Sequence, residues 1–228
     1  MKINEIFYSI QGEGRYIGKP TGFIRLSECN LSCPQCDTKY ANEGTPLSID
    51  AVVSITKKRI PEFCKNICIT GGEPLLQMSD LELLLEQTYF KNKNISIETN
   101  GTLFPSSKLL SNFLIDYVPD WKCPSSEPKL PFNTDWLKFY ELGRVQLKFV
   151  VFNKVDLLYV KSQIPKINRD TTEILISPGF NLVKVPEAFI IDVSNRIWMQ
   201  EVVEFAKDNY LRYSLQIHKI IWGNKIGV

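Results

Sequence analysis

The sequence predicts an α/β fold in which helices cover a mostly parallel sheet. Apolar segments rich in β-branched residues alternate with helical segments along nearly all 228 residues, and this alternation favours parallel strands. Hydrophobic residues make up 44% and charged residues 23% of the chain, a composition that supports a sizeable core. Because no repeat, low-complexity tract or linker interrupts the pattern, we expect a single domain over residues 1–228.

The strands are predicted from short apolar runs, of which Val145–Val151 is the clearest. The runs cover residues 3–10, 21–26, 66–70, 95–99, 113–118, 145–151, 173–177 and 211–217. Helices are predicted from their starting residues: Ser48 begins one that runs to about Lys58, and Asn153 caps another, with Asp156 in its first turn. Pro74 and the Ser79–Glu82 capping box predict a helix to about residue 90. Residues 193–208 are helical in pattern, whereas 127–142 predict a loop with room for a short helix.

The charge balance excludes a broad electrostatic surface for nucleic acid or membrane. Lysine and arginine number 27 and aspartate and glutamate 25, so the formal net charge is +2. The N-terminal residues do not form a signal peptide, and no apolar run has the roughly 18 residues of a membrane span. We therefore expect a cytoplasmic protein that binds neither nucleic acid nor membrane. In that reducing compartment, clustered cysteines indicate metal binding or catalysis rather than disulfides.

One cluster, Cys29, Cys33 and Cys36, has the spacing C-x3-C-x2-C. Thiolates are soft ligands that suit zinc or iron–sulfur clusters. A closed zinc site needs four protein ligands, and a fourth ligand is hard to find nearby. A 4Fe-4S cluster held by three cysteines would leave one iron open to a small molecule. The spacing favours the cluster, with a zinc site and a chance grouping as the alternatives.

Several segments of unusual composition follow directly after predicted strands. They are residues 11–14, 29–38, 70–73, 98–101, 120–122 and 177–179. Because ligand sites in parallel α/β folds gather at the carboxyl ends of the strands, we expect these segments to converge on one rim. Arg25 lies inside an apolar strand and must have an anionic partner, either a ligand carboxylate or a core ion pair.

The cysteine loop, together with a strand that ends in Gly71-Gly72-Glu73-Pro74, resembles the radical S-adenosylmethionine (radical SAM) enzymes. This resemblance implies a partial, open β/α barrel. It also implies a 4Fe-4S cluster whose open iron is chelated by the methionine part of SAM. One electron from that cluster cleaves SAM to a 5′-deoxyadenosyl radical in such enzymes.

Further motifs resemble the 7-carboxy-7-deazaguanine synthase family and extend over essentially the whole chain. They are Ile10–Gly14, Phe23-x-Arg25, Cys36-Asp37-Thr38, Glu98–Gly101, Gln146–Lys148 and Gln216–Lys225. The resemblance implies ring contraction of 6-carboxy-5,6,7,8-tetrahydropterin to 7-carboxy-7-deazaguanine with loss of ammonia, in the biosynthesis of queuosine-type 7-deazapurines. It also implies Mg²⁺, which prefers oxygen ligands, an electron donor such as flavodoxin or ferredoxin, and a homodimer.

The resemblance assigns roles to individual positions. Cys29, Cys33 and Cys36 are the expected cluster ligands, and the Thr38 hydroxyl is the expected Mg²⁺ ligand. The expected substrate contacts are Ile10, Gln11, Gly12, Glu13, Arg25, Thr70 and His218, which is the single histidine. The expected SAM contacts are Gln35, Cys36, Asp37, Gly72, Glu73, Asp120, Trp121, Lys122, Ser177, Pro178 and Gly179. Gln35 replaces the aromatic residue usual in radical SAM enzymes, so a backbone contact is expected there.

Two other functions fit parts of the sequence. A radical SAM activase, which generates a glycyl radical on a partner protein, shares the cysteine loop but needs neither the Gln-Gly-Glu-Gly turn nor a hydroxyl after the cysteines. A non-catalytic metal-binding protein is the alternative from another class. The remaining cysteines, Cys64, Cys68 and Cys123, are expected to be structural, because free cysteine packs as a small hydrophobic residue.

Overall fold

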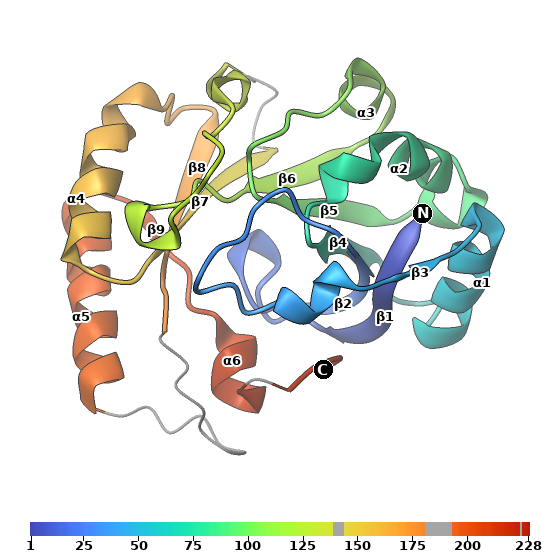
Figure 1. Ribbon diagram of the computed structural model, residues 1–228, viewed down its shortest axis with the longest axis horizontal. Helices are drawn as coiled ribbons and strands as arrows, with labels where there is room; N and C mark the ends of the chain where they lie inside the picture. Colours follow the sequence, from blue (N-terminus) through green and yellow to red (C-terminus); the bar gives the residue numbers. More distant parts are fainter. Residues whose placement is uncertain (139–143, 181–192, 224) are drawn as a thin grey trace.

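A nine-stranded sheet forms the centre of the molecule, with helices packed outside it (Figure 1). The computed structural model describes residues 1–138, 144–180, 193–223 and 225–228. The strands are β1 Lys2–Ile10, β2 Pro20–Leu26, β3 Thr45–Pro46, β4 Asn66–Gly71, β5 Asn94–Thr99, β6 Ile115–Pro119, β7 Val145–Val151, β8 Thr172–Pro178 and β9 Arg212–Tyr213. Their order in the sheet is β3-β1-β2-β4-β5-β6-β7-β8-β9.

The expected parallel arrangement holds for most of this sheet. Each strand from β2 through β9 runs parallel to its neighbours in that part of the order. Only β1 departs from the pattern, because it pairs antiparallel with both β2 and β3. The strand order is linear and therefore open, in agreement with the partial barrel that the resemblance implies.

The helices confirm two of the predicted starting residues. They are α1 Ile49–Arg59, α2 Met78–Leu85, α3 Ser107–Asn112, α4 Lys154–Gln163, α5 Val193–Asp208 and α6 Ile217–Trp222. The Ser48 hydroxyl accepts a hydrogen bond from the Ala51 amide at 3.2 Å, and the Asn153 side chain accepts one from the Asp156 amide at 3.1 Å. These caps satisfy backbone donors that the first helical turn leaves unpaired.

The predicted capping box is wrong. Ser79 lies inside α2, and Gln77, which precedes the helix, provides no side-chain cap. The cap is made four residues earlier than Gln77, where the Glu73 carboxylate accepts from the Leu75 amide at 2.9 Å and begins a 3-10 turn. The helix also ends at Leu85, short of the expected residue 90.

Two other boundaries differ from expectation. The predicted strand 211–217 is reduced to Arg212–Tyr213, because the Ile217 amide donates to the Gly12 carbonyl at 3.1 Å and begins α6. The sequence did not predict helix α3, which ends at Asn112. Two residues separate it from β6, which begins at Ile115. The predicted loop 127–142 contains a short 3-10 helix over Thr134–Leu137, and its residues 139–142 lie outside the described part of the chain.

The buried side chains form two hydrophobic clusters, one toward each end of the strand order. One gathers around β2, β4 and β5, with Ile24, Ile69 and Ile97 fully buried. The other gathers around β7, β8, α4 and α5, and includes Phe149 and Ile176. The three cysteines expected to be structural, Cys64, Cys68 and Cys123, are all buried. Among the described residues, no helix combines the length and apolarity needed to cross a membrane.

Candidate active site

A cavity of about 480 Å³ lies at the carboxyl ends of the central strands. Segments that follow β1, β2, β4, β5, β6 and β7 line it, and so does α6. The lining includes most of the residues expected at the site: Ile10, Gln11, Gly12, Glu13, Arg25, Cys29, Cys33, Gln35, Cys36, Asp37, Thr38, Thr70, Gly72, Asp120, Lys122 and His218. The carboxyl ends of the parallel strands therefore meet at one cavity, as expected. The Gln11–Glu13 turn reaches the same cavity differently, because β1 runs antiparallel to β2 and Ile10 pairs with Pro20 at the start of β2.

The cysteine loop leaves β2 and contributes all three of its thiols to the cavity wall. Cys29 and Cys33 are half-buried and Cys36 is exposed, and none forms a disulfide. Burial raises the pKa of Cys33, while the nearby Lys122 cation opposes that shift. No three His, Cys, Asp or Glu side chains in the described ranges are grouped tightly enough for a single metal ion. The fit to an iron–sulfur cluster rests on this soft donor set facing one cavity.

Hydrogen bonds of the Gln11 side chain fix the turn after β1, and this turn lines the cavity. The Gln11 side-chain oxygen accepts from the Gly12 amide at 2.7 Å, and its Nε2 donates to Glu98 at 3.2 Å. A Cβ atom on Gly12 would lie 1.9 Å from Nδ1 of His218, so only glycine fits between the turn and the imidazole. Burial lowers the pKa of His218 and thus favours the neutral ring.

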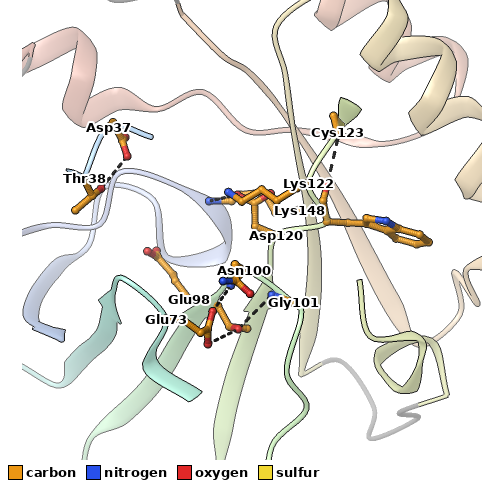
Figure 2. A network of polar contacts seen from close by, with 12 residues as sticks. Asp37, Thr38, Glu73, Glu98, Asn100, Gly101, Asp120, Lys122, Cys123 and Lys148 are labelled. Atoms are coloured by element: carbon orange, nitrogen blue, oxygen red, sulfur yellow. Dashed lines mark hydrogen bonds and ion pairs between the residues drawn. The ribbon is translucent and has the colours of Figure 1, made fainter. Parts of the chain in front are cut away.

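A buried charge network crosses the floor of the cavity. The Lys148 ammonium lies 3.1 Å from the Glu13 carboxylate. It also lies 3.8 Å from Asp120, and the Lys122 ammonium lies 2.7 Å from Asp120 (Figure 2 shows these three residues). Gln216 Nε2 also donates to Glu13 at 2.7 Å. Burial alone would raise the pKa of the Glu13 carboxyl. The Lys148 cation and the other donors outweigh burial and lower that pKa from 4.5 to about 2. Asp120 Oδ1 is buried and has no hydrogen-bond partner among the described residues.

Arg25 forms the core ion pair, one of the two arrangements that its position left open. Its Nε donates to Glu5 at 2.7 Å, which is the core ion pair. The guanidinium also lies over the rings of Phe7 and Tyr40, each 5.7 Å from its centroid, and it lines the cavity. Burial opposes the cation, yet Tyr40 and Glu5 raise its pKa, so Arg25 remains charged where it lines the cavity.

The segment after the third cysteine carries oxygen groups on the cavity wall. The Thr38 hydroxyl donates to Asp37 at 2.8 Å, and Lys219 from α6 forms an ion pair with Asp37 at 2.6 Å (Figure 2 shows Asp37 and Thr38). The Lys219 ammonium holds the pKa of Asp37 well below its usual range. A hydroxyl beside a carboxylate is a hard donor set of the kind that Mg²⁺ prefers.

Glu73 is placed differently from the expectation of a side-chain contact with SAM. It is fully buried and does not line the cavity. Its carboxylate accepts from the Leu75 amide at 2.9 Å, the Thr99 hydroxyl at 2.8 Å and the Asn100 amide at 2.6 Å (Figure 2). The side chain therefore ties the end of β4 to the end of β5, and Gly72 is the member of the pair that faces the cavity.

Of the later loops expected to contact SAM, Asp120 and Lys122 line the cavity, whereas Trp121 and Ser177–Gly179 do not. The Trp121 ring packs in the core against Phe132, with ring centroids 4.3 Å apart. Ser177, Pro178 and Gly179 are buried at the end of β8, where the Gly179 amide donates to the Val151 carbonyl at 2.7 Å. Because β8 is next to the last strand of the sheet, its end lies beside the cavity wall rather than in it.

The cavity contains side chains that the sequence did not assign as site residues. They include Glu98, Asn100, Lys148, Phe152, Gln216 and Lys219. Lys148 carries the same signal as Arg25, a cation inside an apolar strand, and could have been found by it. Gln216 lies in the predicted strand 211–217, but the structure places it directly before α6. Lys219 lies beyond that predicted strand, in α6, a helix that the sequence did not predict.

Comparison with known proteins defines the class first. Residues 24–113 match the family model described as the Radical SAM superfamily. The fold is similar to that of QueE from Escherichia coli, with a TM-score of 0.68 and 18% identity over 94% of this chain and 93% of that one. It is also similar to Streptococcus suis SuiB bound to S-adenosylmethionine, with a TM-score of 0.55 and 14% identity over 85% of this chain and 51% of that one. The fold and the cysteine loop are those of a radical SAM enzyme.

Curated relatives then narrow the class to one family. The 7-carboxy-7-deazaguanine synthase of Clostridium acetobutylicum is 36% identical over 100% of this chain and 99% of its own length. That of Thermoplasma acidophilum is 32% identical over the full length of both proteins. That of Methanospirillum hungatei is 42% identical over 78% of this chain and 72% of its own. The chain belongs to the 7-carboxy-7-deazaguanine synthase family.

Proposed function

We propose that the cavity converts 6-carboxy-5,6,7,8-tetrahydropterin to 7-carboxy-7-deazaguanine with loss of ammonia, using a 4Fe-4S cluster and SAM. The observation that carries the proposal is that the cysteine loop and a set of polar and charged side chains line one cavity. Its volume of about 480 Å³ falls within the roughly 300–1,000 Å³ typical of small-molecule sites. The activase alternative explains the cysteine loop but leaves this wall without a role.

The substrate-facing wall offers both donors and acceptors. Gln11, Thr70 and Glu98 form one group, in which the Thr70 hydroxyl donates to Glu98 at 3.0 Å. A pterin has donor and acceptor atoms along its edge, so carboxylate and amide groups in fixed positions would orient it. The Arg25 cation would hold the substrate carboxylate, and His218 would lie against the bound molecule beside Gly12, with Ile10 and Glu13 completing the wall.

Cys29, Cys33 and Cys36 would hold the cluster, and residues beside them would hold SAM. When bound, the cluster supplies the electron for reductive cleavage of SAM. The Asp120 oxygen without a partner would accept a hydroxyl or ammonium hydrogen bond, and the Lys122 ammonium would face a carboxylate. Gly72 and the backbone of residues 35–37 would complete this side of the site.

Anaerobic reconstitution with iron and sulfide, followed by incubation with SAM, a reductant and the carboxytetrahydropterin, tests this function. We expect the deazaguanine product and no net consumption of SAM. Cys33→Ala should remove the cluster and all SAM cleavage, whereas Cys64→Ala, a matched change at a buried cysteine outside the cavity, should retain bound iron. SAM cleavage without product would contradict the substrate, and a protein that binds zinc without iron–sulfur absorbance would contradict the radical chemistry.

Thr38 is our proposed ligand for Mg²⁺. Its hydroxyl lies beside Asp37 on the wall that faces the substrate side. Thr38→Ala should raise the Mg²⁺ concentration needed for half-maximal activity about tenfold, the effect of losing roughly 1.4 kcal/mol of binding, while iron content stays unchanged. Thr38→Ser, which keeps the hydroxyl, is the control. An identical Mg²⁺ response in Thr38→Ala and the parent protein would remove Thr38 from the metal site.

The proposed partners are supported by two separate exposed features. Cys36 is exposed, so an electron donor of the flavodoxin or ferredoxin type could approach the cluster closely. Exposed apolar side chains on α4 and α5, namely Val155, Leu158 and Ile197, support a homodimer, which light scattering on the purified protein would test. Three free thiols at one site support work in the reducing cytoplasm.

A further inference from the structure

The side chain of Asn100 points at one of the cluster cysteines. Its Nδ2 lies 3.6 Å from the Cys29 sulfur and donates to it. The backbone amide of Leu31 donates to the same sulfur at 3.4 Å. Asn100 follows β5 while Cys29 follows β2, so this contact joins two strand ends that are separated by β4 in the sheet.

A closed ring of hydrogen bonds fixes which end of the Asn100 amide faces the sulfur. The Thr102 backbone N–H, which can only donate, donates to Asn100 Oδ1 at 3.0 Å. The NH₂ group must therefore lie on the other side, where it reaches Cys29 and also donates to Asn30 Oδ1 at 2.8 Å. Asn30 Nδ2 then donates to the Thr102 hydroxyl at 2.8 Å, and that hydroxyl donates to Asn100 Oδ1 at 2.7 Å. Each donor in the ring has one acceptor, so the amide cannot flip without breaking it.

The backbone of Asn100 is anchored independently of its side chain. Its amide donates to the buried Glu73 carboxylate at 2.6 Å (Figure 2), and the residue is only 8% exposed. The backbone position of Asn100 is therefore fixed independently of its side chain. The side-chain NH₂ group can donate to the Cys29 sulfur without being needed to hold the residue in place.

We propose that Asn100 is a positioning residue that raises the reduction potential of the iron–sulfur cluster. Donors to a ligating thiolate withdraw charge from it and stabilise the more negative, reduced state of the cluster. The ring with Asn30 and Thr102 keeps the donor aimed at Cys29, so the orientation is set before any cluster or SAM is bound. The inference depends on the cluster and not on the identity of the substrate.

Redox titration of the reconstituted protein, followed by electron paramagnetic resonance without SAM or substrate, tests the proposal. Asn100→Leu removes the donor at similar size, and Asn100→Asp replaces it with an acceptor. At the midpoint potential of the parent protein, we expect the ratio of reduced to oxidised cluster to fall about fivefold in Asn100→Leu, the factor that corresponds to one ordinary hydrogen bond. Asn100→Asp should shift the midpoint further in the negative direction.

Two further variants complete the experiment. Thr102→Val keeps Asn100 but breaks the ring, and should shift the potential in the same direction by a smaller amount. Asn94→Leu, at the opposite end of β5 where its amide donates to Asn66, should leave the potential unchanged. Unchanged potentials in Asn100→Leu and Thr102→Val would overturn the proposal, as would cluster loss in Asn100→Leu combined with an unchanged potential in Thr102→Val. A shift that appears only after SAM is added would also overturn it and would indicate a contact with SAM instead.

Discussion

The centre of the sheet and its β8–β9 end differ in how deeply their charged pairs are buried. At the centre, the Lys148–Glu13 pair has side chains only 11% and 12% exposed and lines the cavity. At the far end, Arg212 and Glu173 form a pair at 2.9 Å whose side chains are 38% and 32% exposed. The two pairs have similar distances, and each has a further charge nearby, Asp120 beside Lys148 and Arg15 beside Glu173. Of the two, the first is the one removed from water.

This difference shows how an open sheet distributes function. All the parallel strands end at the same edge, but only the central ones face the concave space that becomes the cavity. The strands near the end of the order have the same direction without the same surroundings. Burial of charge, rather than strand direction, marks which strand ends take part in the chemistry.

The largest expected effect comes from breaking the central pair. Lys148→Met leaves the Glu13 carboxylate buried without its cation, and we expect a loss of about 3 kcal/mol in the free energy of unfolding. The matched change Arg212→Met should cost only about 0.5 kcal/mol, because that pair is exposed to water. Urea denaturation of both variants measures the difference. Equal losses would show that the two ends of the sheet do not differ as described.

Acid should also remove the contribution of the central Lys148–Glu13 pair to the free energy of unfolding. The pKa of Glu13 is about 2 in the folded protein against an ordinary value of 4.5, so the unfolded chain binds the proton first as pH falls. The contribution of Glu13 to stability is therefore complete above pH 4.5 and is lost as pH falls toward 2. Denaturation series across this range should show a weaker pH dependence in Lys148→Met than in the parent protein. The same slope in both would contradict the assigned cause of the shift.

A smaller effect separates two residues at the strand ends, Glu73 after β4 and Ser177 at the end of β8. Glu73→Ala strands three buried donors and should cost about 2 kcal/mol. Ser177 is fully buried, but its hydroxyl has no hydrogen-bond partner among the described residues, so Ser177→Ala should leave stability within about 0.5 kcal/mol. Thermal unfolding compares them. Weaker SAM binding in Ser177→Ala would instead show that the β8 end reaches the site.

The sequence was sufficient for those parts of the site that local pattern controls. The spacing of Cys29, Cys33 and Cys36 and the glycine turn at Gln11–Gly14 each follow a strand that apolar alternation identifies. Strand direction correctly places the cysteine loop among the other carboxyl ends of the parallel strands. It does not account for the glycine turn, because β1 runs antiparallel to β2. Arg25 was recognised as a buried cation, although its partner Glu5 depends on the register of β1 against β2, which the sequence does not display.

The remaining differences come from contacts between distant segments. Leu211, Tyr213, Leu215 and Ile217 alternate as a strand would, but hydrogen bonding to Gly12 turns the chain into α6 instead. Ser177–Gly179 follow a real strand, and only the position of β8 in the sheet order decides that they miss the cavity. Of the C-terminal motif that resembles the family, Asn224 lies outside the described residues.

The contact between α6 and the first turn has a consequence for synthesis. Gln216 and Glu13 are 203 residues apart in the chain, and they pair across the same wall that Lys219 completes beside Asp37. A ribosome adds roughly 5–20 residues per second, so the cysteine loop leaves it about 10–40 s before that wall can form. During this interval Glu13 lacks Gln216 and Asp37 lacks Lys219. This side of the cavity is therefore completed last, by the C-terminal end of the chain.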